Sequence, residues 1–290
     1  MTVRKVGYLG PKATFTHVAV QEVFKEYEHI PFKTIPSCID AVCADEVEYG
    51  IVPLENALEG SVNLTLDYLI HESRLPIVGE MILPIRQHLM VHADHADKWQ
   101  QVSAVYSHPH AIAQCHKFLH GTFSHVAVEE MTSTAFAAKY VSENPHLLVG
   151  AIANGLAARE YGLHIACPNI HDYDHNTTRF VILHKNSKQS VPFQTMGGHK
   201  TTLMITLPSD QAGALHQVLS AFSWRKLNLS KIESRPMKTG LGNYFFIVDI
   251  EQEMDEVLIP SAIAELEALG CTVAVLGSYP HTLLETELPL

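Results

Sequence analysis

The sequence lacks the features that mark secreted, membrane-spanning and disulfide-bonded proteins. Its first ten residues, MTVRKVGYLG, contain no apolar run followed by a small-residue cleavage site, so we expect no signal peptide. No stretch of about 18 or more apolar residues occurs, which argues against a membrane-spanning helix. The five cysteines are odd in number and form no C-x-x-C pair, which disfavours a disulfide scaffold. These absences predict a reduced, cytoplasmic protein that does not act at a membrane.

Positive charge is scarce as well. Lysine and arginine together number 20, against 31 aspartates and glutamates, and the net charge is -11. We find no basic stripe of the kind that nucleic-acid binders carry, so we expect no nucleic-acid partner. An acidic protein binds an anion only where local arginines or helix N-termini reverse the field.

The usual catalytic and cofactor-binding motifs are missing too. There is no P-loop, no G-x-S-x-G and no Ser–His–Asp set at recognisable spacing. The stretch GYLGPKAT resembles a dinucleotide-binding turn only loosely, because Pro11 and Ala13 break the G-x-G-x-x-G pattern. We therefore expect no cofactor.

Histidine is abundant, with 19 residues, but its spacing does not predict a metal site. The two groups that come closest are His88, His92 and His95, and the pair His116 and His120. Neither group has an H-E-x-x-H pattern or a nearby carboxylate at ligand spacing. We expect these histidines to be solvated or packed, and no metal to be bound.

What the chain does contain is a repeated unit over its first 185 residues. Five times a short apolar strand ends in a small polar turn before a helix, with helices expected over 14–27 and 61–71 among others. This alternation predicts an α/β fold with a largely parallel sheet, in which ligands bind beyond the carboxyl ends of the strands. Any one polar turn is explained by helix capping alone, but five of them favour a polar cleft.

The pattern changes in the last third of the chain. Residues 185–200 have no periodicity and contain Gly197 and Gly198, so they are interpreted as a linker between domains at 1–184 and 201–280. Beyond the linker come a strand, an amphipathic helix, two strands joined at Gly240 and Gly242, a helix over 255–269 and a closing strand. This βαββαβ order predicts a ferredoxin-like sandwich.

One stretch, HNTTRFVIL, places hydrogen-bonding side chains directly before an apolar strand. Asn176, Thr177, Thr178 and Arg179 precede the buried-looking run that begins at Phe180. The polar side chains either cap a surface turn or form the floor of a site that binds a carboxylate. The residues alone leave these two alternatives about evenly balanced.

Five motifs in order make the chain resemble prephenate dehydratase: GYLGPKATFTHVA, GIVPLENALEGSV, YSHPHAIAQC, TSTAFAA and NTTRF. The tail, with GALHQVLSAF and KIESRP, resembles the regulatory ACT domain that follows that enzyme. The resemblance covers nearly the whole chain. It implies a two-lobed α/β catalytic domain like that of periplasmic binding proteins, a ferredoxin-like ACT domain, prephenate as substrate and L-phenylalanine as effector. It also implies a homodimer or a dimer of dimers.

The resemblance also implies roles for individual residues. The catalytic triplet would be Thr178, Arg179 and Phe180, although we expect Phe180 itself to pack in the core. The substrate would be lined by Asn56, Ser107, Ser133, Thr134, Asn154, Asn176 and Thr177. The effector would be bound by Gly213, Ala214, Leu215, Asn228, Glu233, Ser234, Arg235 and Pro236.

Three positions depart from the family pattern, and two other functions remain open. Ala13, Ala57 and His110 stand where glycine, serine and glutamine are common. A single side-chain contact could favour arogenate over prephenate, which would make the enzyme an arogenate dehydratase. A two-lobed α/β fold also serves non-catalytic small-molecule sensors, because fold alone does not fix function.

Overall fold

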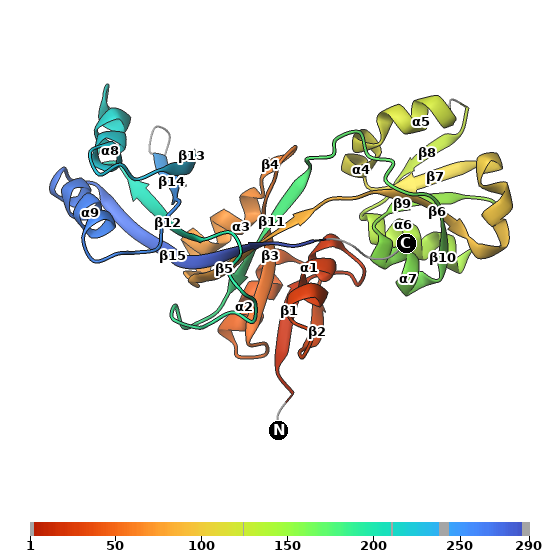
Figure 1. The fold of residues 1–290 in the computed structure, drawn as a ribbon, viewed down its shortest axis with the longest axis horizontal. Helices are drawn as coiled ribbons and strands as arrows, with labels where there is room; N and C mark the ends of the chain where they lie inside the picture. The colour runs from red at the N-terminus through yellow and green to blue at the C-terminus, as the bar shows by residue number, and fades with distance from the viewer. Residues whose placement is uncertain (1–2, 124, 210, 238–243, 286–290) are drawn as a thin grey trace. The chain divides into compact units, whose positions relative to one another are not determined.

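A computed structural model describes residues 3–123, 125–209, 211–237 and 244–285 (Figure 1). Contacts divide the chain into two units. The first comprises Met1–Tyr68, Ile82–Phe180 and Leu284–Leu290, and the second comprises Leu69–Met81 and Val181–Leu283. Strands β5 (Ile77–Pro84) and β11 (Thr177–Leu183) contribute residues to both units, and each unit is described by itself.

The first unit begins with a sheet whose strands run in the order β11-β3-β1-β2. Strand β1 is parallel to both of its neighbours, and the short β4 pairs antiparallel with β3. The elements are β1 (Lys5–Leu9), α1 (Phe15–Val23), β2 (Glu28–Phe32), α2 (Ile35–Cys43), β3 (Tyr49–Asn56), β4 (Gly60–Ser61) and α3 (Asn63–Tyr68). Helix α2, which the repeated pattern did not predict, starts with a capping box in which Thr34 and Ser37 satisfy each other's backbone N–H groups.

A second, five-stranded sheet in the same unit has the order β10-β6-β9-β7-β8. Its elements are β6 (His88–His92), the 3-10 helix η2 (Ala93–Gln101), β7 (Ala104–Ser107), α4 (Pro109–Gln114), α5 (His116–Thr122), β8 (Ala127–Glu130), α6 (Thr134–Glu143), β9 (Gly150–Ala153), α7 (Gly155–Tyr161) and β10 (Leu163–Cys167). Figure 1 shows helices α4 to α7 around this sheet. Strand β7 is parallel to β8 and β9, whereas β6 is antiparallel to β9 and β10. The α/β class is confirmed, with a mixed second sheet where a largely parallel one was expected.

The second unit contains the predicted βαββαβ domain. Its elements are β12 (His199–Thr206), α8 (Ala214–Ser223), β13 (Leu229–Pro236), β14 (Tyr244–Ile250), α9 (Leu258–Ala268) and β15 (Thr272–Leu283). The strands pair antiparallel in the order β13-β14-β12-β15, which is the ferredoxin-like arrangement. Strand β12 begins two residues before the predicted start of this domain, and the turn predicted at Gly240 and Gly242 lies outside the described residues.

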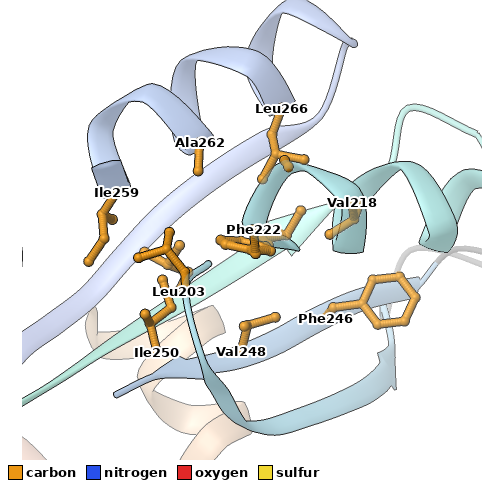
Figure 2. Close-up of a cluster of buried hydrophobic side chains, with 12 residues drawn as sticks. Leu203, Val218, Phe222, Phe246, Val248, Ile250, Ile259, Ala262 and Leu266 are labelled. Atoms are coloured by element: carbon orange, nitrogen blue, oxygen red, sulfur yellow. The ribbon is translucent and has the colours of Figure 1, made fainter. Parts of the chain in front are cut away.

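Helices α8 and α9 cover one face of this antiparallel sheet. In Figure 2, Val218 and Phe222 from α8 lie against Leu203, Val248 and Ile250 of the strands. The matching face of α9 presents Ile259, Ala262 and Leu266 to the same cluster. These side chains are at most 1% exposed. Their spacing along each helix places them on one stripe, so their burial drives the packing of both helices.

The second unit also includes a segment that the sequence did not assign to it. The π-helix η1 (Leu69–Ser73) and the first residues of β5 group with this domain. The His71 and Phe245 rings lie 6.1 Å apart, edge to face, and Lys200 Nζ donates to Glu80 Oε1 at 2.7 Å. Both charged side chains of that pair are buried, so losing either partner would leave a charge in an apolar setting.

No helix within the described part of the chain is long and apolar enough to span a membrane.

Candidate active site

The polar residues at the start of β11, with Asn176 just before it, lie against the end of β3. Asn56 Nδ2 donates to Thr178 Oγ1 at 2.9 Å, and Arg179 Nη1 donates to Glu55 Oε2 at 2.6 Å. The Ala57 backbone N–H donates to the carbonyl of Thr177 at 2.9 Å. Residue numbers rise from 55 to 57 along β3 while those of their partners fall from 179 to 177 along β11, as expected for antiparallel neighbours. We call this set the β3–β11 cluster: Glu55, Asn56, Asn176, Thr177, Thr178 and Arg179.

Asn56 is the centre of the cluster. Its Nδ2 also donates to Asn176 Oδ1 at 3.0 Å and to the Thr177 carbonyl at 3.2 Å. Its Oδ1 accepts the backbone N–H groups of Leu58 and Glu59 at 3.0 and 3.1 Å. Because two N–H donors face Oδ1, the amide orientation is fixed. The structure therefore joins four of the predicted site residues, Asn56, Asn176, Thr177 and Thr178, in one hydrogen-bond network.

The TRF triplet is divided between this network and the core. The hydroxyl-bearing Thr178 is 8% exposed, and Phe180 is 2% exposed. The Arg179 side chain is 14% exposed and its partner Glu55 is 28% exposed. Successive side chains of a strand point to opposite faces, so those of Thr178 and Arg179 lie on different faces of β11. Phe180 contributes packing, as expected from its position in the apolar run.

The other predicted lining residues lie on strand β7 of the second sheet or at the starts of helices α6 and α7. Ser107 is fully buried and its hydroxyl donates to the Ile152 carbonyl at 2.7 Å. Ser133 caps helix α6, in which Thr134 is the first residue. Asn154 caps helix α7 through Oδ1, and its Nδ2 donates to the Ala13 carbonyl at 2.9 Å. That last bond connects the start of α7 with the loop after β1.

The departures from the family pattern lie beside these contacts. Ala13 has a φ of 64°, in the left-handed region that glycine adopts without strain, which explains why glycine is common there. Its N–H donates to His17 Nδ1 at 3.0 Å, and burial lowers the pKa of His17 to about 4, with His29 and Lys12 lowering it further. The neutral ring is therefore the form that accepts this bond.

His110 contacts the turn that holds Asn56. Its Nε2 lies 3.7 Å from Glu59 Oε2, and the neighbouring His108 ring is 4.8 Å away, edge to face. Burial lowers the pKa of His108, and His110 adds to the effect, while Glu59 and Glu130 oppose it. The sequence reasoning missed Glu55, which belongs to the β3–β11 cluster, and Glu59, which lies beside it. Glu55 could have been predicted, because it is the carboxylate next to Asn56 in PLEN, at the end of an apolar strand.

A pocket of about 710 Å³ lies at the start of helix α8 in the second unit. Of the predicted effector residues, Gly213, Ala214, Leu215 and Ser234 line it. Gly213 has a φ of 87° and, as the N-cap residue, has no side chain to cap the helix, so the backbone N–H groups of the first turn are candidates for binding an anion. Among the described residues, the pocket is also lined by Leu207, Ser209, Gln211, His216, Leu219, Met237, Tyr244 and Phe246.

The other predicted effector residues lie away from this lining. Along β13, Ser234 alternates with Glu233 and Arg235, so these two side chains point to the other face of the sheet. Arg235 Nη1 donates to Glu233 Oε1 at 3.2 Å. Asn228 donates to Glu251 Oε2 at 2.7 Å, and Pro236 ends the strand. The ESRP motif therefore presents only Ser234 to the pocket.

Within the described ranges, no group of three or more His, Cys, Asp or Glu side chains could hold a metal ion. The His116 and His120 rings stack at 6.0 Å, and His88 Nδ1 accepts the Asn169 backbone N–H at 3.0 Å. The histidine groups noted in the sequence thus make ring and backbone contacts.

Comparisons with known proteins identify the family of the chain. The family model described as prephenate dehydratase matches residues 6–188, and the ACT domain model matches residues 201–270. Prephenate dehydratase of Bacillus subtilis is 61% identical over 95% of this chain and 98% of its own. The crystal structure of prephenate dehydratase from Arthrobacter aurescens in complex with L-Phe has a TM-score of 0.84 at 31% identity, covering 95% of this chain and 90% of that one.

The Staphylococcus aureus prephenate dehydratase structure gives a TM-score of 0.80 at 31% identity, over 95% of this chain and 99% of that one. The resemblance and the enzyme class predicted from the sequence are thereby confirmed. This chain belongs to the prephenate dehydratase family, with an ACT domain after its dehydratase region.

Proposed function

We propose that this dehydratase converts prephenate to phenylpyruvate at the β3–β11 cluster, with Thr178 hydrogen-bonded to the departing hydroxyl. The observation that carries the assignment is the bond from Asn56 Nδ2 to Thr178 Oγ1. Because the threonine oxygen accepts that bond, its own hydrogen is directed elsewhere. A substrate hydroxyl placed beside Thr178 would receive it.

The chemistry needs little more than orientation and one donor. Prephenate is a dianion in which a cyclohexadiene carries a carboxylate and a hydroxyl on opposite ring carbons. When the ring carboxylate leaves as carbon dioxide, its C–C bonding pair enters the ring and the C–O bond breaks. Hydroxide departs with the C–O bonding pair and becomes water on taking a proton from solvent, which leaves aromatic phenylpyruvate. Aromatisation supplies the driving force, so a strong base is unnecessary.

Threonine is a weak acid, so Thr178 acts chiefly by hydrogen bonding to the charge that develops on the leaving oxygen. Arg179 lies on the other face of β11 from Thr178, so it is proposed to bind the second substrate carboxylate, away from the departing hydroxyl, through the planar fork of its guanidinium. Its Nη1 also donates to Glu55 Oε2.

Regulation by L-phenylalanine is the second part of the proposal. The pocket at α8 offers backbone N–H groups for a carboxylate and apolar walls, including Leu219 and Phe246, for a ring. The relative from Arthrobacter aurescens was crystallised with L-Phe. Leu215 and Tyr244 line the pocket yet are 38% and 45% exposed, so we propose that a second copy of this domain covers them in a homodimer or a dimer of dimers.

The test is incubation with prephenate while phenylpyruvate absorbance is followed, with arogenate supplied in parallel. The proposal predicts turnover of prephenate and its inhibition by added phenylalanine. Turnover of arogenate alone would reassign the substrate, and binding without any turnover would favour a sensor. Light scattering of the purified protein measures the number of copies.

A further inference from the structure

Asn56 has no hydrogen-bonding capacity left for a substrate. An amide side chain offers two N–H hydrogens and two acceptor positions on its oxygen. Both acceptor positions of Oδ1 are used by the backbone N–H groups of Leu58 and Glu59. The two hydrogens of Nδ2 are shared among Asn176 Oδ1, the Thr177 carbonyl and Thr178 Oγ1. A substrate ligand would need one of these positions to be open.

The same contacts set the direction of the Thr178 hydroxyl. A threonine hydroxyl rotates to suit its partners unless one of them fixes its role as donor or acceptor. Asn56 Nδ2, at 2.9 Å, can only donate, so Thr178 Oγ1 must accept on that side. A donor behind the oxygen also polarises the O–H bond, because successive hydrogen bonds reinforce one another. The hydroxyl is thus a better donor toward the leaving group.

The turn after β3 holds the amide in place. The Leu58 and Glu59 N–H groups anchor Oδ1, and the Ala57 N–H ties the same turn to Thr177. Asn56 is therefore held from both sides, by the turn that follows it and by the strand that it faces. Preorganisation of this kind removes the cost of turning the donor during the reaction.

We propose that Asn56 is a positioning residue for the dehydration and not a ligand of the substrate: it fixes and polarises the hydroxyl of Thr178. This inference rests on the proposed role of Thr178. It predicts that substitutions at Asn56 lower the turnover number and leave the KM for prephenate nearly unchanged, because binding does not use this side chain.

The experiment is a double-mutant cycle between Asn56 and Thr178, measured as kcat and KM for prephenate. Asn56→Asp keeps the acceptor for Leu58 and Glu59 but replaces the donor with an acceptor, so Thr178 would turn its hydrogen toward the new carboxylate. We expect kcat to fall roughly 10- to 100-fold and KM to change less than about threefold. In the Thr178→Ala background the same substitution should change kcat by less than about threefold.

Two further variants keep the test decisive if Asn56→Asp folds poorly. Asn56→Ser retains a hydroxyl acceptor for the turn but loses the amide donor, and it should reproduce the loss of kcat. Asn63→Asp places the same new charge on an exposed residue at the start of α3, and it should leave kcat unchanged. Thermal unfolding midpoints of all variants verify that they are folded.

Two results would overturn the positioning role. One is a KM increase of about tenfold or more with kcat preserved, which would make Asn56 a substrate ligand. The other is multiplication of the two effects in the double variant, which would show that Asn56 acts independently of Thr178. Normal turnover in Thr178→Ala alone would instead contradict the proposed function.

Discussion

The proposed dehydratase site and the proposed phenylalanine pocket are built from different chemical groups. The β3–β11 cluster consists of side chains that hydrogen-bond one another, among them the Asn56–Thr178 and Arg179–Glu55 pairs. The pocket at α8 combines a helix start at Gly213 with apolar walls. A site for chemistry needs oriented donors, whereas a site for recognition needs a carboxylate-binding helix start and a cavity. Substitutions should therefore change turnover in the first region and affinity in the second.

The largest expected effect is on turnover, at Thr178. Thr178→Ala removes the donor to the leaving oxygen, so kcat should fall roughly 10²- to 10⁴-fold, or about 3–5 kcal/mol, with a smaller change in KM. Thr178→Ser should retain more activity. Thr201→Ala, which removes a buried hydroxyl from the other region, is the matched control and should keep kcat. The measurement is steady-state kinetics with prephenate. Near-normal turnover in Thr178→Ala would rule out Thr178 as the donor to the leaving oxygen.

Acid should destabilise the first unit through its buried histidines. Burial lowers the pKa of both His17 and His88 from 6.5 to about 4. Between these values the unfolded chain binds protons that the folded one does not, so stability is full above about pH 6.5 and falls as pH drops toward 4. Each histidine contributes on the order of 3 kcal/mol to this loss.

Denaturant unfolding at several pH values measures the acid effect. His88→Gln should flatten the dependence between pH 6.5 and 4, while His120→Gln, in the last turn of α5, should leave it as in the wild type. Equal slopes for the two variants and the wild type would show that His88 is not the titrating group.

Arg179→Lys should have a smaller effect than loss of the Thr178 hydroxyl. Lysine keeps the charge beside Glu55 but loses the planar fork, so we expect KM to rise about tenfold, or about 1.4 kcal/mol, with kcat within about threefold. Arg225→Lys provides the control, because Arg225 makes a similar 2.7 Å pair with Glu265 in the other unit. Unchanged kinetics in Arg179→Lys would exclude Arg179 as a bidentate ligand of the substrate.

The smallest effect is expected at the proposed effector pocket. Gly213 has a φ of 87°, which an alanine adopts only with strain of about 1 kcal/mol, although its Cβ would meet nothing within 4 Å. Gly213→Ala should therefore weaken phenylalanine binding roughly fivefold and leave kcat unchanged. Gly121→Ala, where the added Cβ also meets open space, is the control. Calorimetry that shows equal phenylalanine affinity in both variants would exclude this helix start as the carboxylate site.

Local patterns predicted most of the fold, and non-local contacts account for what they missed. The βαββαβ order and the apolar stripe of α8 are periodic, so they could be predicted. The grouping of η1 with the C-terminal domain depends on contacts such as His71 with Phe245, which no short window contains. Helix α2 could have been found from its capping box at Thr34 and Ser37.

The candidate site, like the fold, could be predicted from local sequence only in part. The motif TRF identified Thr178 and Arg179, but their partners lie more than 120 residues away along the chain, at Asn56 and Glu55. Sequence reasoning therefore placed Asn56 among the substrate ligands and omitted Glu55. The alternation of side chains along β13 could be predicted from the sequence. Only the folded sheet shows which face borders the pocket, and that Ser234 alone of the ESRP motif lines it.

The separation of chemistry from effector recognition is tested most directly by calorimetric titration of L-phenylalanine into Thr178→Ala. The account predicts a Kd within about twofold of the wild-type value in an enzyme whose turnover has fallen roughly 100-fold or more, because the pocket uses none of the β3–β11 side chains. Loss of phenylalanine binding in this folded variant would contradict it, since the two sites would then share Thr178.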